Sequence, residues 1–86
     1  MNKKQQETYE SIFEKPVRPD ILWADIEKLL EGLGATITEG RGSRVRVALN
    51  GVKAVFHRPH PERISDRGQV ASVRRFLESA NEDPRC

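Results

Sequence analysis

The stretch Gly42-Ser43-Arg44-Val45-Arg46-Val47-Ala48-Leu49-Asn50-Gly51-Val52-Lys53-Ala54-Val55-Phe56-His57 decides how this chain folds. Two runs that alternate between apolar and polar residues flank Asn50-Gly51, a dipeptide that tolerates the positive φ angles of a type I′ turn. The pattern predicts a β-hairpin with a two-residue turn, in which Leu49 lies opposite Val52. The other pairings of the hairpin follow from this one.

The predicted register divides the hairpin into two faces, because successive side chains of a strand point to opposite sides of the sheet. One face is apolar and belongs in the core; it carries the pairs Leu49/Val52, Val47/Ala54 and Val45/Phe56. The other face carries the pairs Ala48/Lys53, Arg46/Val55 and Arg44/His57. Charged side chains are costly to bury without partners, so we expect this second face to be open to solvent or to an anionic partner.

Two helices are expected before the hairpin. In residues 1–15 the spacing of Tyr9, Ile12 and Phe13 predicts a short helix that ends before Pro16 and either docks on the domain or frays. Apolar residues then recur with helical spacing over residues 22–33, up to Gly34, a natural C-terminal cap.

A short strand is expected at residues 35–39, separated from the hairpin by the loop at residues 40–43. Pro59 and Pro61 end the last strand, because proline cannot donate a hydrogen bond to its neighbour. Ser65 is expected to cap a final helix that runs to about Asn81.

The order helix, three antiparallel strands, helix is an α+β fold. If the strands form a meander, both helices cover the apolar face and leave the charged face free. We expect residues 1–19 to form an N-terminal extension, residues 20–81 the domain and residues 82–86 a C-terminal tail. With 86 residues and 36% hydrophobic content, the chain predicts a thin two-layer structure with one small core.

Composition also excludes several classes of protein. No stretch approaches the roughly 20 apolar residues of a membrane span, so we expect a cytoplasmic protein that does not contact a membrane. Cys86 is the single cysteine and has no companion at metal-ligand spacing. We expect neither a metal site nor a cofactor.

Positive charge is concentrated in the middle of the chain. Residues 41–75 contain nine basic and two acidic residues, a net charge of +7, so the rest of the chain carries −5 of the overall +2. Clustered Lys and Arg bind phosphate backbones and release counterions. The central block therefore favours a nucleic-acid partner over an ordinary solvated surface.

The sequence resembles the HicA family of toxins over about residues 20–80. The resemblance is carried by Asp25-Ile26-Glu27-Lys28-Leu29-Leu30 with Leu33-Gly34, by Gly42-Ser43, by the Asn50-Gly51 hairpin and by His57-Arg58-Pro59-His60-Pro61. It implies a fold like that of double-stranded-RNA-binding domains, an mRNA interferase activity, an RNA (mRNA) partner and a HicB-type antitoxin. The family's catalytic histidine follows the glycine–serine pair, and here Arg44 or Val45 holds that place.

Strand alternation puts Arg44 on the charged face of the hairpin, so we match it to the family's catalytic position. Arginine is a poor base but holds phosphate through its planar guanidinium, so the substitution preserves binding more readily than cleavage. His57, predicted directly across from Arg44, is the candidate catalytic residue, because imidazole serves as both acid and base near neutral pH. The residues expected to bind RNA are Arg41, Ser43, Arg44, Arg46, Lys53, His57, Arg58 and His60.

Three further residues have two interpretations each. Trp23 either stacks a base or, as we favour, packs against Tyr9 or Phe13 of the N-terminal segment. Arg74 and Arg75 either extend the basic surface or are ordinary solvated helix residues.

Two function classes remain open. The first is a HicA-like toxin that binds mRNA, with ribonuclease activity resting on His57. The second is a non-catalytic module on the same fold that binds RNA or an acidic protein through its basic face. The salt dependence of nucleic-acid binding distinguishes an RNA-binding face from a protein-binding one.

Overall fold

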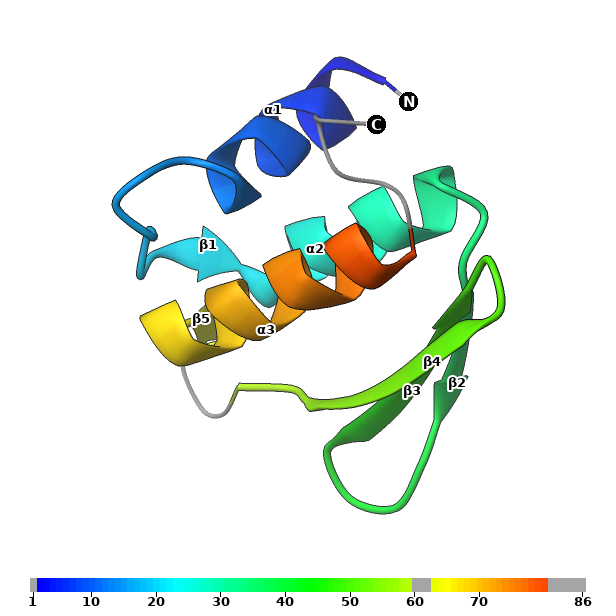
Figure 1. The fold of residues 1–86 in the computed structure, drawn as a ribbon. Helices are drawn as coiled ribbons and strands as arrows, with labels where there is room; N and C mark the ends of the chain where they lie inside the picture. Colours follow the sequence, from blue (N-terminus) through cyan, green and yellow to red (C-terminus); the bar gives the residue numbers. More distant parts are fainter. Residues whose placement is uncertain (1, 60–62, 81–86) are drawn as a thin grey trace.

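A three-stranded antiparallel sheet and two helices packed on one of its faces form the body of the molecule (Figure 1). The computed structural model describes residues 2–59 and 63–80. Its elements are α1 (Lys3–Ile12), β1 (Ile21–Leu22), α2 (Trp23–Gly32), β2 (Thr36–Glu39), β3 (Arg44–Leu49), β4 (Val52–His57), β5 (Ile64–Ser65) and α3 (Arg67–Ser79). The predicted α+β class and the order α-β-β-β-α, formed by α2, β2, β3, β4 and α3, are confirmed.

The hairpin has the predicted turn and register. Leu49 lies opposite Val52, and the pairing continues outward to Arg44 opposite His57. Asn50 and Gly51 have φ angles of 51° and 82°, as a type I′ turn requires. The Asn50 side chain also donates a hydrogen bond of 2.8 Å to the carbonyl oxygen of Ala80, which ties the turn to the end of α3.

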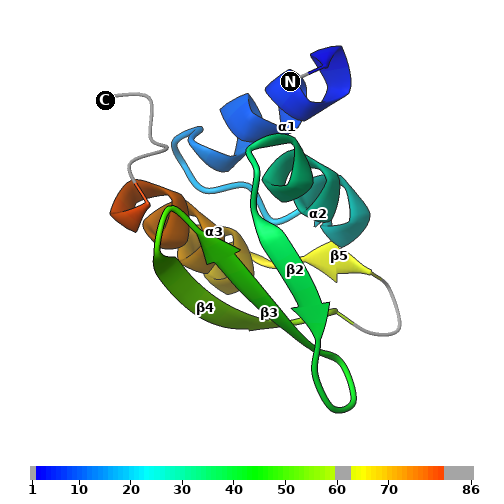
Figure 2. The same ribbon diagram turned by 90° about the vertical axis from the view of Figure 1, so that its right-hand side faces the viewer.

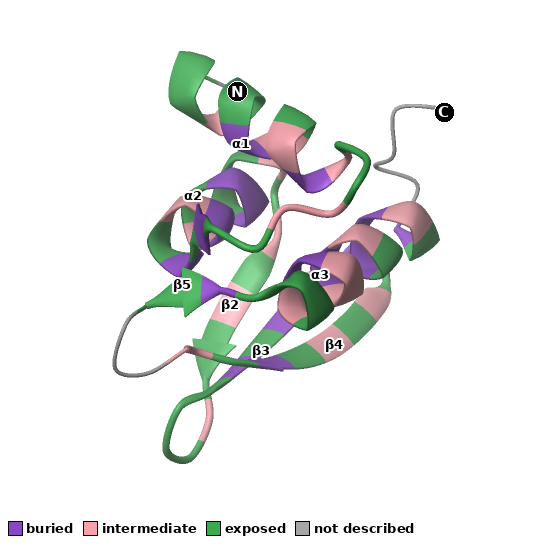
Figure 3. Cartoon of the chain, turned by 90° about the vertical axis from the view of Figure 1, so that its left-hand side faces the viewer, coloured by how far each residue is buried: buried purple, intermediate pink, exposed green. Residues whose placement is uncertain are grey.

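Burial follows the predicted alternation. Val45, Val47 and Leu49 of β3 are buried, whereas Arg44 and Arg46, which alternate with the two valines, are exposed. Figure 3 shows the resulting colour bands along the strands. The apolar side of the sheet is covered by the buried faces of α2 and α3, to which Leu30 and Leu77 belong. The meander β2-β3-β4 and the placement of two helices on one face are therefore confirmed.

The N-terminal helix docks, so the expected two layers become three. Helix α1 lies on the side of α2 and α3 that faces away from the sheet (Figure 1). Ile12 has no exposed surface and belongs to the same core cluster as the sheet residues. A two-layer expectation failed here because sequence spacing shows that a helix has an apolar edge but not what covers it.

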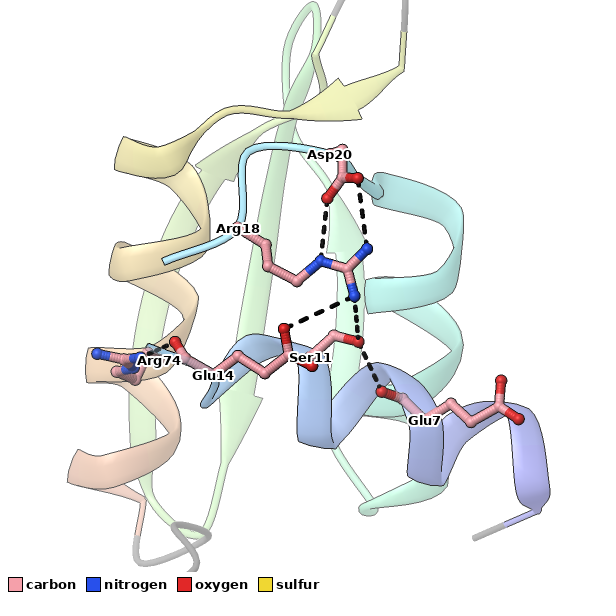
Figure 4. A network of polar contacts seen from close by, with 6 residues as sticks. All are labelled: Glu7, Ser11, Glu14, Arg18, Asp20 and Arg74. Atoms are coloured by element: carbon pink, nitrogen blue, oxygen red, sulfur yellow. Dashed lines mark hydrogen bonds and ion pairs between the residues drawn. The ribbon is translucent and has the colours of Figure 1, made fainter. Parts of the chain in front are cut away.

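Polar contacts hold the end of α1 and the following connector in place (Figure 4). Arg74 of α3 donates to the carbonyl oxygens of Ile12 and Glu14, at 3.4 and 2.8 Å. Arg18 bonds both carboxylate oxygens of Asp20, and its side-chain hydrogen bond holds the pKa of that carboxyl below its usual value. Of the two interpretations of Arg74, solvated residue or basic surface, neither describes this role in anchoring α1.

The predicted cap of the last helix was wrong by one residue. Asp66 caps α3, accepting a 2.8 Å hydrogen bond from the backbone N–H of Gln69. Ser65 lies instead in β5, where it pairs with Ile21 of β1. Strands of two residues have no periodic pattern, so the sequence did not indicate them. The predicted helix end near Asn81 lies outside the described residues, as do Pro61 and Cys86.

Ser65 gives a first prediction. Its side chain is fully buried, and its hydroxyl has no hydrogen-bond partner within the described residues. Because an unpaired buried hydroxyl opposes folding, Ser65→Ala is expected to raise the free energy of unfolding by up to about 1 kcal/mol, or about 4–8 °C in melting temperature. Thermal and urea melts measure this. Ser65→Val, which adds volume to the same site, should lower stability; a loss of more than about 1 kcal/mol in Ser65→Ala would contradict the argument.

Candidate nucleic-acid interface

The face of the sheet opposite the helices is cationic; we call it the open face. Its strand positions are Thr36, Thr38, Arg44, Arg46, Ala48, Lys53, Val55 and His57, and Figure 2 looks onto it with the helices behind. None of these positions is acidic. Within the described residues, Arg44, Arg46 and Lys53 form no ion pair. Their positive charge is therefore available to an external anion.

The centre of the open face is hollowed. A depression of about 370 Å³ lies over Thr36, Thr38, Ala48 and Val55, with Arg46 and Lys53 among its lining residues. Val55 is 55% exposed. Apolar surface flanked by cations suits a partner with both flat apolar parts and negative charge, such as the bases and phosphates of a nucleic acid.

Arg44 and His57 face each other at the end of the hairpin. In an antiparallel hairpin, hydrogen-bonded and non-hydrogen-bonded pairs alternate, starting from the hydrogen-bonded pair Leu49/Val52 at the turn. Arg44/His57 is therefore a pair without mutual backbone hydrogen bonds. Side chains are closest in such pairs. Val45 is fully buried while Arg44 is exposed, as the alternation predicted.

The loop of residues 40–43 extends the open face at the same end. Arg41 and Ser43 are exposed. The loop is closed by backbone hydrogen bonds from Gly40 to Arg44 and from Arg44 to Arg41, at 2.9 and 3.2 Å. Gly42 has a φ of 61°, a conformation that glycine adopts without strain. The loop therefore holds one further cation and one hydroxyl beside the Arg44/His57 pair.

Arg58 was predicted to bind RNA, and the structure places its guanidinium between two carboxylates. It donates two hydrogen bonds to Glu27 of α2 and one of 2.6 Å to Glu39 of β2. These contacts raise the pKa of Arg58 above its ordinary value, with Glu27 the larger cause. Its backbone N–H donates to the carbonyl oxygen of Ser43 at 2.8 Å. Arg58 thus joins α2 to both ends of the loop.

Sequence reasoning missed this arrangement. Glu27 and Arg58 lie on different elements, 31 positions apart, and no local pattern links them. The sequence offered one indication of such an ion pair. Few acidic residues lie near the dense basic block, so each of their carboxylates is a strong candidate for pairing with an arginine.

Removal of the Arg58 side chain is expected to lower stability by about 1–3 kcal/mol, because the largely covered Glu27 carboxylate loses its bidentate partner. Glu27 is only 19% exposed and Arg58 34%. Arg58→Lys should recover part of the lost stability, because lysine keeps the positive charge. The recovery is incomplete because an ammonium group lacks the planar fork with which arginine bonds two carboxylates. Urea titration measures both variants. Arg67→Ala serves as the matched control, because Arg67 is exposed and forms no ion pair within the described residues; an equal loss there would contradict the role of Glu27.

The remaining candidates fall in different places. His60 lies outside the described residues. Trp23 is 3% exposed, so it offers no surface for a base; its ring packs against Phe56, with centroids 5.8 Å apart. The sequence predicted Tyr9 or Phe13 as its partner and did not indicate Phe56, because the contact depends on how α2 packs on the sheet. Arg75 is exposed and lines a groove between β4 and α3.

The described residues contain neither a metal-binding cluster nor a membrane-spanning helix. No group of three or more His, Cys, Asp or Glu side chains is placed to hold a metal ion. No helix among the described residues has the length and apolar content to cross a membrane.

Comparison with known proteins identifies a family. A family model for the HicA toxin of bacterial toxin-antitoxin systems matches residues 23–81, from the start of α2 to just beyond α3. No curated protein and no solved structure matches the chain.

Proposed function

The chain belongs to the HicA family of bacterial toxins, and from this membership we propose that it binds mRNA through its open face and is neutralised by a HicB-type antitoxin. Membership makes it a toxin of a toxin–antitoxin system with an antitoxin as its partner. Family membership alone does not identify mRNA as the ligand or the open face as its binding surface. That part of the proposal depends on the chemistry of the open face.

The observation that supports RNA binding is the unpaired positive charge of the open face. Arg44, Arg46 and Lys53 lie on neighbouring strands without an acidic residue among them. Such a face recognises phosphates and 2′-hydroxyls more than base sequence. Arg41 and Ser43 of the loop extend the same surface. Arg58 has a supporting role, because it bonds Glu39 and the Ser43 carbonyl oxygen at the two ends of the loop.

Cleavage is assigned to His57. RNA cleaves itself when a base removes the 2′-hydroxyl proton: the 2′-oxygen then bonds to phosphorus and forms a cyclic phosphate, the bond from phosphorus to the 5′-oxygen breaks, and the leaving 5′-oxygen takes a proton from water. In our proposal the imidazole of His57 accepts the first proton, and the Arg44 guanidinium binds the phosphate. The carrying observation is that the two residues face each other across the strands.

The experiment incubates the purified protein with labelled single-stranded and duplex RNA over a series of salt concentrations and scores cleavage and gel shift together. Cleavage that disappears in His57→Ala, with the RNA still shifted, would establish the assignment. Cleavage that persists in His57→Ala would exclude His57. Salt-sensitive binding without cleavage would leave an RNA-binding protein on the toxin fold.

A second candidate is a module that binds an acidic protein through the same face. The apolar depression over Val55, with Arg46 and Lys53 among its lining residues, favours it, because protein interfaces combine apolar centres with polar rims. The salt series separates the two. Affinity for RNA whose logarithm falls steeply with the logarithm of salt favours the first function, whereas no RNA binding at low salt favours the second.

A further inference from the structure

Strand β4 forms one edge of the sheet and has free backbone groups along it. Among the strands of residues 2–59 and 63–80, it pairs with β3 alone. In antiparallel pairs, hydrogen-bonded and non-hydrogen-bonded residues alternate, so Val52, Ala54 and Phe56 bond β3. The hydrogen bond from the Arg58 N–H to the Ser43 carbonyl, one pair beyond Arg44/His57, fits the same alternation.

The residues between them direct their backbone outward. These are Lys53, Val55 and His57. Within the described residues the His57 carbonyl accepts from the Gln69 side chain, while the N–H groups of all three and the carbonyls of Lys53 and Val55 have no partner. An edge of this kind is a template for a further strand.

A groove runs beside this edge. It has a volume of about 510 Å³ and lies between β4 and α3, with Phe56 and Phe76 at its apolar part and Asp66, Gln69, Ser72 and Arg75 along the α3 side. The other edge strand, β2, is shorter, with four residues against six. Length and adjoining space therefore single out β4.

We propose that the β4 edge receives an extended acidic segment of the antitoxin as a fourth antiparallel or parallel strand. The inference rests on the antitoxin partner of the proposed function. Charge complementarity supports acidic residues on the open-face side of the segment, because Lys53 lies on β4 next to Val55, and Arg46 lies opposite Val55 on β3. Segment residues opposite Lys53 and His57 lie on the open face, and those opposite Ala54 and Phe56 enter the groove.

This placement predicts the pattern of the segment and its consequence. Acidic residues alternate with apolar ones, the acidic ones toward the open face and the apolar ones toward Phe56 and Phe76. The carboxylates then lie beside Lys53 and compete with RNA phosphates. Antitoxin bound at the edge therefore neutralises part of the RNA-binding face without covering all of it.

The test compares Val55→Pro with Val55→Ala. Proline removes the outward N–H of Val55 and leaves the bonds to β3 intact, as prolines in edge strands do; alanine removes the side chain and keeps the N–H. The probe is a purified HicB-type antitoxin, titrated by calorimetry. We expect Val55→Ala to bind within about threefold of the unaltered chain and Val55→Pro to bind about tenfold or more weaker, the effect of losing one or two main-chain hydrogen bonds.

Thermal melts show whether Val55→Pro folds. A second measurement needs no variant: amide hydrogen exchange of Lys53, Val55 and His57 should slow in the complex. Unchanged exchange, or equal antitoxin affinity in both variants, overturns the edge proposal and leaves the antitoxin partnership standing. An antitoxin that does not bind the unaltered chain overturns the HicB-type partnership and this inference together, while RNA titrations report separately on the RNA part of the proposed function.

Discussion

The double variant Arg44→Ala/Arg46→Ala is expected to bind RNA about a hundredfold or more weaker than the unaltered chain. A hydrogen bond to a charged group contributes about 1.5–3 kcal/mol, so each lost arginine costs about tenfold or more. Both side chains are exposed, adjacent on the open face and free of ion pairs within the described residues. Their removal should therefore leave the fold intact. Gel shift or fluorescence anisotropy with labelled single-stranded RNA measures the loss.

The salt dependence gives a second readout of the same variant. Each phosphate contact adds about 0.7 to the slope of log K against log salt for single strands, so the double variant should have a slope shallower by about 1.4. Lys3→Ala/Lys28→Ala removes the same net charge from α1 and α2, where both residues are exposed. If this control weakens binding as much as the double variant, RNA responds to overall charge and the open face is not the binding surface.

The central hairpin could be read from the sequence because local chemistry determines it. Asn50-Gly51 fixes the turn, and strand alternation then fixes every pair out to Arg44 and His57. The same alternation separates buried Val45 from exposed Arg44. The two-residue turn and the alternation of side chains along each strand therefore determine which hairpin residues lie on the open face.

Features that depend on contacts between distant segments could not be read in this way. The bonds of Arg58 to Glu27 and Glu39 require α2, β2 and the end of β4 to be in place first. The β1–β5 pair joins residues 21–22 to residues 64–65 and consists of two residues on each side. Trp23 packs on Phe56 because of how α2 crosses the sheet. Each is decided by tertiary geometry, for which the sequence offers no periodic pattern.

The docking of α1 is the largest of these tertiary features, and it bears on where the domain begins. The sequence predicted an extension over residues 1–19. The family match starts at residue 23, yet Ile12 lies in the common core. If α1 is part of the folding unit, substitution of its buried residue must lower the stability of the whole domain.

Ile12→Ala is therefore expected to lower the free energy of unfolding by about 2–5 kcal/mol, the cost of removing a fully buried isoleucine side chain. A domain of this length has only about 4–13 kcal/mol of stability in total, so the variant should be close to unfolding at 37 °C. Urea denaturation followed by circular dichroism measures the change. Ile12→Val, which removes one methylene, should cost about 0.5–1.5 kcal/mol.

The alternative to a docked helix gives a clearly different result. A frayed α1 would leave residue 12 in water, and substitutions on exposed surfaces stay within about 0.5 kcal/mol. Glu10→Ala, at an exposed position of the same helix, sets that baseline. Equal stability of Ile12→Ala and Glu10→Ala would return residues 1–19 to the status of an extension. A large difference would make α1 part of the cooperative unit. Ile12 of this helix covers the core cluster, and its carbonyl oxygen accepts a hydrogen bond from Arg74 of α3, so loss of α1 would expose the core and leave Arg74 without this contact.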